Sequence, residues 1–98
     1  MYKIIIRPAA EDDLEEAAAW YEARRAGLGR EFLASIDQAL ERLKRHPDFG
    51  IPAHKTLRRT SVSRFPYGVF YQVFGEKILV VGVFHGRRAP RKWKSRLE

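Results

Sequence analysis

The chain has 98 residues, 45% of them hydrophobic and none of them cysteine, which suits a single domain with one core and excludes disulfide bridges, thiolate metal sites and a cysteine nucleophile. Its net charge of +7 is unevenly divided, because residues 1–50 carry 8 Lys and Arg against 10 Asp and Glu, whereas residues 51–98 carry 11 against 2. This asymmetry indicates an anionic partner for the second half, unless the basic residues serve only solubility.

No segment of the sequence is typical of a secreted protein or of one that spans a membrane. The apolar run near the start, Ile4–Ile6, is too short for the hydrophobic part of a signal peptide, and no later stretch approaches the roughly 20 apolar residues of a membrane span. We therefore expect a soluble, cytoplasmic protein that makes no contact with a membrane.

The first predicted element is a short strand over Tyr2–Arg7, which Pro8 ends because proline cannot donate a hydrogen bond to a sheet. A helix follows at once and ends near Gly27. Apolar residues recur in this helix at helical spacing, namely Leu14, Ala17, Ala18 and Tyr21. Trp20 and Tyr21 are expected to pack in the core or against a partner.

An acidic cluster opens this helix and consists of Glu11, Asp12, Asp13, Glu15 and Glu16. Acidic residues there complement the positive end of the helix dipole and otherwise face solvent. A metal site is the alternative, but these side chains point in several directions around a helix. We expect them to stabilise the helix rather than to bind a metal.

A second helix is predicted from Leu28 to Arg45, and Pro47 follows it. Its apolar residues form one stripe, made of Phe32, Ile36, Ala39, Leu40 and Leu43. Because only a short turn separates the two helices, they should form an antiparallel hairpin whose apolar stripes cover a sheet.

Strands dominate the rest of the chain. Residues His46–Thr56 are expected to be a loop, and Leu57–Arg64 a basic strand. Apolar and aromatic residues then fill Tyr67–Phe74, where Tyr67, Val69, Tyr71 and Val73 should share one face of the strand. A two-residue type II′ turn at Gly75-Glu76 leads into the apolar strand Lys77–His85.

The order of these elements predicts an α+β fold, β-αα-βββ: an N-terminal strand, an antiparallel helical hairpin and a three-stranded antiparallel meander. All 98 residues should form one domain, with a basic C-terminal tail over residues 87–98. Two helices cover only one face of such a sheet. The other face must be closed by the tail, by a partner or by self-association.

Familiar catalytic and cofactor motifs are missing from the sequence. The three histidines, His46, His54 and His85, lack the spacing of metal ligands, and there is neither a glycine-rich phosphate loop nor a nucleophile elbow. We therefore predict no metal and no cofactor. His85 ends the apolar strand, where it either assists a proton transfer or makes a local hydrogen bond.

Two basic stretches are the strongest candidates for a binding surface. The first contains Lys55, Arg58, Arg59 and Arg64, and the second contains Arg87, Arg88, Arg91, Lys92, Lys94 and Arg96 around Trp93. An arginine guanidinium can donate two parallel hydrogen bonds to a phosphate or a carboxylate. A neighbouring aromatic ring can stack on a base or pack against a protein. The alternative is a solvated, flexible tail, above all for Lys94 and Arg96.

Three stretches together resemble the RelE/ParE toxin superfamily, in its ParE-like branch. They are Asp13–Ala17 with Trp20-Tyr21 and Gly27–Phe32, then Arg64–Tyr71, and finally Val83–Pro90 with Trp93. The resemblance spans nearly the whole chain and implies the same β-αα-βββ arrangement. It also implies an intracellular toxin of a type II toxin–antitoxin system, which its cognate antitoxin neutralises in a hetero-oligomeric complex.

The two branches of this superfamily imply different functions. RelE-like members cleave mRNA on the ribosome, whereas ParE-like members inhibit DNA gyrase. RelE-like toxins usually carry an arginine directly after the tyrosine of the third strand, but here Gly68 follows Tyr67. The runs Phe65–Tyr67 and His85–Arg88 are also similar to ParE, so the resemblance favours the gyrase-directed branch.

Three functional hypotheses follow. In the first, the protein is not an enzyme and binds gyrase through Arg87, Arg88, Arg91, Lys92 and Trp93. In the second, it is a ribosome-dependent endoribonuclease with the catalytic residues Lys55, Arg58, Arg59, Arg64, His85 and Arg87. In the third, it is a non-toxic member that survives as a partner-binding domain.

Overall fold

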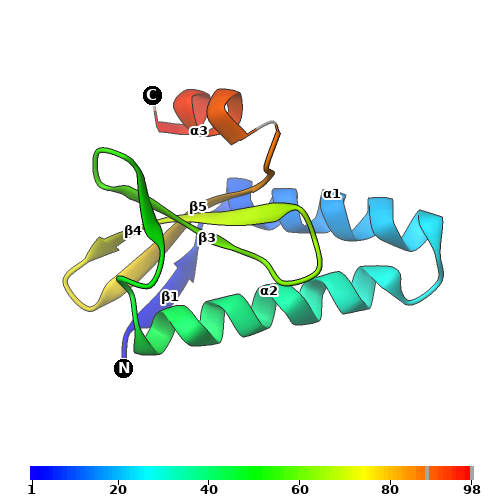
Figure 1. The fold of residues 1–98 in the computed structure, drawn as a ribbon, viewed down its shortest axis with the longest axis horizontal. Helices are drawn as coiled ribbons and strands as arrows, with labels where there is room; N and C mark the ends of the chain where they lie inside the picture. Colours follow the sequence, from blue (N-terminus) through cyan, green and yellow to red (C-terminus); the bar gives the residue numbers. More distant parts are fainter. Residues whose placement is uncertain (88, 98) are drawn as a thin grey trace.

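The computed structural model describes residues 1–87 and 89–97, which form a five-stranded sheet and three helices (Figure 1). The elements are β1 (Lys3–Ile6), α1 (Pro8–Arg24), α2 (Leu28–Arg45), β2 (Ile51–His54), β3 (Leu57–Ser61), β4 (Tyr67–Phe74), β5 (Lys77–His85) and α3 (Ala89–Leu97). The predicted α+β class is confirmed, as are the N-terminal strand, the helical hairpin and the antiparallel meander of β3, β4 and β5.

The strand order is β1-β5-β4-β3-β2. β1 pairs with β5 in parallel, and Lys3 lies opposite Lys77. All other neighbours are antiparallel. The first strand of the chain therefore pairs with the last strand, although most of the sequence separates them.

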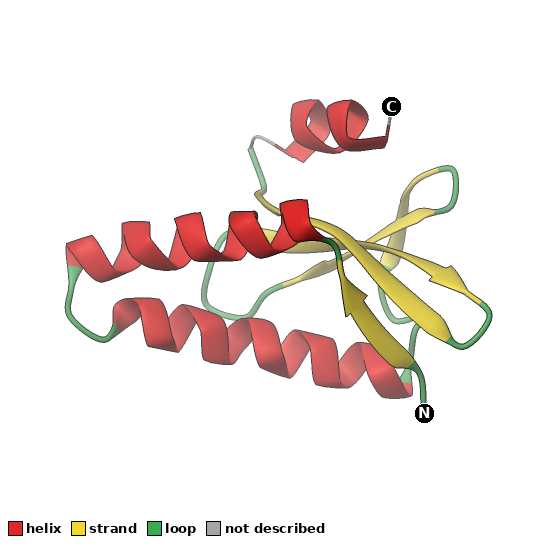
Figure 2. Cartoon of the chain, turned by 180° about the vertical axis from the view of Figure 1, so that it is seen from behind, coloured by secondary structure: helices red, strands yellow, loops and turns green. Residues whose placement is uncertain are grey.

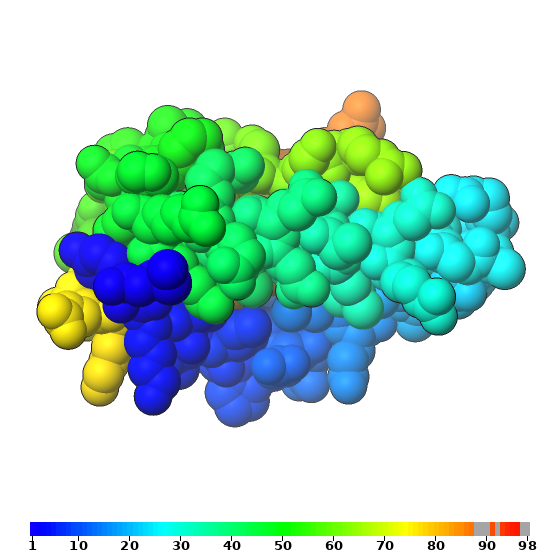
Figure 3. All heavy atoms as spheres, turned by 90° about the horizontal axis from the view of Figure 1, so that it is seen from below, coloured from blue at the N-terminus to red at the C-terminus, as the bar shows by residue number. Residues whose placement is uncertain are grey.

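The sheet separates two layers of helix. α1 and α2 pack side by side on one face, whereas α3 lies on the other (Figures 1 and 2). Seen from the helical side, α2 forms much of the outer surface, and the N-terminal residues lie beside the β4–β5 hairpin (Figure 3). Within the described residues, no helix is both long and apolar enough to cross a membrane.

Each face of the sheet has its own apolar core. Phe32 and Ile36 of α2 meet Val69 and Tyr71 of β4 in the larger core, as the alternation in β4 predicts. The smaller core beneath α3 contains Leu57, Phe70, Val81 and Phe84, with Trp93 packed against it. The C-terminal segment thus covers the second face of the sheet, which was one of the three predicted alternatives.

A bulge in β5 lets this strand serve both cores. Phe70 lies opposite Gly82 and Tyr71 opposite Val80, so Val81 is an extra residue without a partner on β4. Val81 is buried in the smaller core, while Val80 and Val83 belong to the larger one. A Cβ atom at residue 82 would overlap the Phe84 ring, so the bulge requires glycine there.

The β4–β5 turn has the predicted type. Gly75 has a φ of 57°, whereas Glu76 is not among the residues with positive φ. A type II′ turn needs a positive φ at its first central residue alone, and glycine adopts it without strain.

Two predictions about the connections were wrong. The expected loop His46–Thr56 contains the edge strand β2, whose Pro52 is tolerated because only one side of an edge strand is paired. The expected strand Leu57–Arg64 ends at Ser61, because Arg64 has a φ of 72° and the Val62 amide donates to the Tyr67 carbonyl across a turn.

The predicted basic tail contains a helix. Residues 89–97 form α3. Its Trp93 ring lies 4.7 Å from the His54 ring, with 31° between the ring planes, so α3 contacts β2 as well as β5.

Candidate functional site

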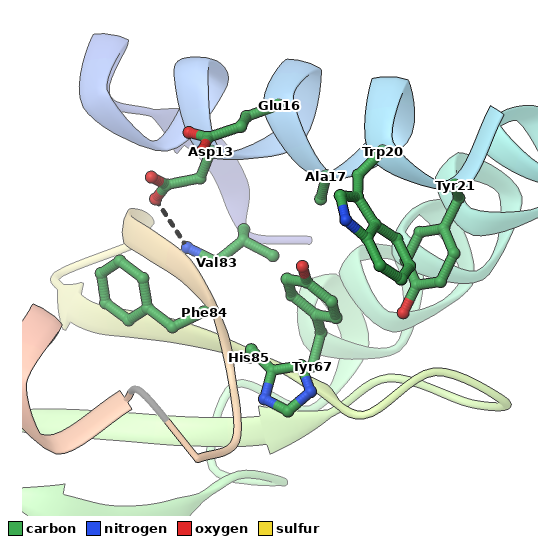
Figure 4. Close-up of a pocket in the computed structure, with 9 residues that line it drawn as sticks. All are labelled: Asp13, Glu16, Ala17, Trp20, Tyr21, Tyr67, Val83, Phe84 and His85. Atoms are coloured by element: carbon green, nitrogen blue, oxygen red, sulfur yellow. Dashed lines mark hydrogen bonds between the residues drawn. The ribbon is translucent and has the colours of Figure 1, made fainter. Parts of the chain in front are cut away.

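A groove runs between α1 and the ends of β4 and β5, and its volume is about 260 Å³ (Figure 4). It is lined by Asp13, Glu16, Ala17, Trp20, Tyr21, Tyr67, Val83, Phe84 and His85. One end is acidic and the other aromatic, because successive turns of α1 present acids first and aromatic residues later.

The aromatic end combines a core residue with an exposed one. Tyr21 contacts the Phe32 and Phe65 rings at 5.3 and 4.9 Å, and burial raises the pKa of its hydroxyl. Trp20 is 52% exposed, with the Arg24 guanidinium 3.9 Å from the centre of its ring. Tyr21 therefore stabilises the core, whereas Trp20 offers apolar area to a partner.

Asp13 closes the acidic end and is mostly buried. Its Oδ2 accepts hydrogen bonds from the Val83 amide at 3.0 Å and from Arg96 Nη1 at 2.9 Å, and its Oδ1 accepts from Arg96 Nη2 at 3.2 Å. Asp13 was expected to face solvent near the helix start, and that prediction was wrong. The carboxylate instead joins α1, β5 and α3.

Arg96 is the counterpart of Asp13 on α3. Besides Asp13, its Nη1 donates to the Val81 carbonyl at 3.0 Å, and its guanidinium lies 4.9 Å from the centre of the Phe84 ring. These contacts exclude, for Arg96, the alternative of a solvated side chain. Lys94, by contrast, is exposed on the same helix.

His85 makes the local hydrogen bond that was one of its two predicted roles. Its Nδ1 accepts from the Arg87 amide at 3.2 Å, and its ring meets the Tyr67 ring at 5.5 Å with 78° between the planes. In the neutral ring the proton then sits on Nε2. This bond spans the turn that directly follows β5.

The residues predicted to bind the target lie on and before α3. Arg87 and Arg91 are exposed, and no acidic side chain of the described residues pairs with either. Trp93 is half-buried against the smaller core. Arg88 and the side chain of Lys92 lie outside the described residues.

The six residues of the ribonuclease hypothesis do not share one site. Arg58 donates to the carbonyls of Asp48 and Gly50, and thereby holds the segment before β2. Arg64 pairs with Glu31 of α2 at 2.7 Å, and this contact is the main cause of the lowered pKa of Glu31.

The other four members of that set lie in three places. Lys55 is exposed in the turn between β2 and β3, and His85 lines the groove. Arg59 lines a second hollow. Gly86 lines the same hollow, and Arg87 is the next residue in the chain.

This second hollow lies between β3, β4 and the end of β5, and its volume is about 230 Å³. It is lined by Arg59, Ser61, Phe65, Pro66, Tyr67, Gly68, Phe70 and Gly86. In residues 1–87 and 89–97, no group of three His, Cys, Asp or Glu residues is placed to hold a metal ion.

Two features of the site were missed by sequence reasoning. The Asp13–Arg96 pair joins residues 83 positions apart, and no local spacing signals such a contact. Glu22, at the tip of the hairpin, accepts from the Gly27 and Gly29 amides and so caps α2. An acid shortly before a Gly-Leu-Gly turn was the available signal for this cap.

Comparison with known proteins adds two findings. A family model described as the ParE toxin of the type II toxin–antitoxin system, parDE, matches residues 4–90. A chain from a solved structure of the chromosomal ParDE toxin–antitoxin system of P. aeruginosa superposes with a TM-score of 0.77 at 16% identity, over 87% of this chain and 96% of that one. No curated protein matches the sequence.

Proposed function

The chain belongs to the ParE toxin family of type II toxin–antitoxin systems, and we propose that it inhibits DNA gyrase in the cytoplasm until a cognate antitoxin binds it. The gyrase-binding surface consists of Arg87 and Arg91, together with the neighbouring Arg88, Lys92 and Trp93. We name the first two residues the target arginines.

The observation that carries this proposal is that α3 is anchored while Arg87 and Arg91, before it and on it, are exposed. Arg96 fastens the helix to Asp13 and to the Val81 carbonyl. The target arginines are exposed and have no acidic partner among the described residues. Because α3 is anchored, the backbone that carries Arg91 is ordered before it meets a partner, so binding costs less conformational entropy.

The direct test is supercoiling of relaxed plasmid by purified gyrase, with and without the folded toxin. We expect lost supercoiling and accumulated cleaved DNA. The variant Arg87→Glu/Arg91→Glu should inhibit at least tenfold more weakly, because charges at an interface control association and register. Full gyrase activity in the presence of excess folded native toxin would contradict the proposal.

The matched control is Lys77→Gln, which also removes a positive charge but lies at the opposite end of β5. Its inhibition should equal that of the native chain. Truncation before α3 is a weaker test, because it would uncover Phe70 and Phe84 and destabilise the sheet. Point variants keep the smaller core covered.

We further propose that the antitoxin places an apolar side chain in the groove beside Trp20. Trp20 lines the groove and is 52% exposed, so its ring offers apolar area to a side chain that enters the groove. Trp20→Ala should weaken the toxin–antitoxin complex at least tenfold while gyrase inhibition persists. Equal affinity of the native and variant toxins in titration calorimetry would place the antitoxin elsewhere.

The ribonuclease hypothesis has less support, because Arg58 and Arg64 are already engaged in contacts within the protein. This hypothesis predicts that, after induction of the toxin, mRNA is cut at the codons that ribosomes occupy. A toxin that leaves gyrase active and produces such cuts would establish this second function in place of the first.

A further inference from the structure

Arg59 is unusual among the arginines of this chain. Four of the described arginines are half-buried: Arg42, Arg58, Arg59 and Arg96. Arg58 and Arg96 bond carbonyls or a carboxylate, and Arg42 reaches the Ser61 carbonyl at 3.4 Å. Among the described residues, Arg59 alone of these four has no acceptor. None of its nitrogen atoms is both buried and unpaired, so the guanidinium is open to solvent and free to bond a ligand.

The hollow around Arg59 holds the side chain in place. Arg59 lies opposite Phe70 of β4, and Ser61 lies opposite Gly68. A Cβ atom at Gly68 would be 3.1 Å from Arg59 Cγ and 3.2 Å from Arg59 Cδ. Because glycine occupies this position, the arginine stem can lie across β4, and its guanidinium is directed before any ligand arrives.

The chemistry of this hollow is that of an anion site. Its lining contains one guanidinium, the Ser61 hydroxyl and no carboxylate. The rings of Phe65 and Phe70 give it apolar walls, and an apolar wall strengthens the attraction between a cation and an anion. An oxyanion that enters would accept from Arg59 and from Ser61.

The surroundings indicate which oxyanion this is. Gly86 lines the hollow and Arg87 follows it directly in the chain, whereas Arg91 lies on α3. Both target arginines are exposed and have no acidic partner among residues 1–87 and 89–97. A single carboxylate would satisfy Arg59 and leave those two unmatched. A nucleic-acid backbone presents one phosphate after another, so it can supply an oxyanion to each of the three arginines.

We propose that the hollow binds a backbone phosphate of DNA, held by Arg59 and Ser61, with the next phosphates against Arg87 and Arg91. This inference deepens the proposed function, on which it rests, because a toxin that traps gyrase on cleaved DNA works beside exposed phosphates. The toxin then contacts the DNA itself as well as the enzyme.

The test measures binding of the full-length toxin, without gyrase, to a fluorescein-labelled DNA duplex at several salt concentrations. Arg59→Gln should weaken binding roughly tenfold, because it removes a charge-assisted hydrogen bond. The slope of log affinity against log salt should also fall by about 0.9, which corresponds to one lost phosphate contact. Ser61→Ala should weaken binding less and leave the slope unchanged.

The matched control is Arg45→Gln, an exposed arginine at the end of α2. It removes the same charge away from the hollow, so its affinity should stay within about twofold of the native value, because salt screens a distant charge. Equal losses for Arg59→Gln and Arg45→Gln would overturn the proposal in favour of non-specific attraction. Circular dichroism confirms that each variant is folded.

Two further outcomes separate this inference from the proposed function. If Arg59→Gln leaves duplex affinity unchanged but weakens the antitoxin complex, the hollow binds a protein carboxylate and the phosphate proposal is wrong. If the native toxin binds the duplex through Arg59 yet leaves gyrase fully active, the phosphate site stands and gyrase inhibition does not.

Discussion

Asp13 and Arg96 are 83 positions apart in the sequence, yet both oxygens of the carboxylate bond the guanidinium. Their side chains are only 16% and 21% exposed, so solvent screens this pair less than it screens the surface pairs. Asp13 also accepts from the Val83 amide, and Arg96 donates to the Val81 carbonyl. The pair therefore fastens the bulged part of β5 to a helix on each side.

We predict that removing either partner destabilises the fold. Asp13→Asn and Arg96→Gln should each lower the free energy of unfolding by about 2 kcal/mol, because each leaves a poorly solvated charge or donor without its partner. The double variant should cost less than the sum of the two. Urea unfolding of all four proteins gives the coupling, which we expect to be about 1–2 kcal/mol.

The neighbouring Asp12 provides the control for this cycle. It is exposed on the same turn of α1, and no described residue forms an ion pair with it. Asp12→Asn should therefore change stability by less than about 0.5 kcal/mol. Strictly additive losses for Asp13→Asn and Arg96→Gln would mean that the two residues do not act as a pair.

At the scale of the element, the helical hairpin depends on a carboxylate at its tip. Gly27 has a φ of 88° and turns the chain between α1 and α2. The two oxygens of Glu22 accept from the Gly27 amide at 2.9 Å and the Gly29 amide at 3.0 Å. These bonds satisfy donors that the start of α2 would otherwise leave free, and they lower the pKa of Glu22.

This cap should make stability depend on pH. A carboxyl whose pKa is lowered by folding stabilises the protein above its ordinary value of 4.5, and this contribution is lost as the pH falls through the lowered pKa. Glu22→Gln offers one oxygen for two amides, so it should be less stable at neutral pH. The difference in melting temperature should shrink below pH 4.5 and then disappear.

Glu15→Gln is the control, because Glu15 is exposed on α1 without a hydrogen-bonded partner in the described part of the chain. Its melting temperature should follow that of the native protein at every pH. A Glu22→Gln deficit that stays constant from neutral to acidic pH would show that the charge of Glu22 plays no part in the cap.

The elements that the sequence predicts well are those with strong local patterns. α2 carries an apolar stripe, and β4 alternates between faces, so their positions follow from periodicity alone. β2 lacks such a pattern, because all four of its residues are exposed and it contains Pro52. α3 is rich in cations, and its formation depends on Trp93 and Arg96 reaching distant residues.

The candidate functional residues divide in the same way. Arg87 and Arg91 are exposed cations, which local sequence is sufficient to indicate. The separation of Arg58, Arg59 and Arg64 into three environments is not predictable from their clustering in sequence. It depends on strand register and on the distant acceptors Gly50 and Glu31.

At the scale of the whole molecule, β5 is the element that all layers share. It pairs with β1 on one side and β4 on the other, and its residues enter both cores. The helical hairpin contacts β5 from one face through α1, and α3 contacts it from the opposite face. Neither core can be dismantled without exposing one face of this strand, so the molecule should unfold as one cooperative unit.

The two tryptophans offer a direct measurement of this cooperativity, because each reports on one layer. Trp20 lies on α1 and Trp93 on α3, on opposite sides of the sheet. Trp93→Phe leaves Trp20 as the only tryptophan, and Trp20→Phe leaves Trp93. In urea, the fluorescence transition of each variant should coincide with its own circular dichroism transition, since two-state unfolding gives one midpoint for every probe.

If Trp93 fluorescence changed at lower urea than the circular dichroism of the same variant, α3 would be a separate unit that opens before the rest. That result would contradict the anchoring that Asp13 and Arg96 provide, and it would also remove the argument that the backbone carrying Arg91 is ordered before it meets a partner. Coincident transitions would instead mean that α3, which carries Arg91 and follows Arg87, is as stable as the sheet it covers.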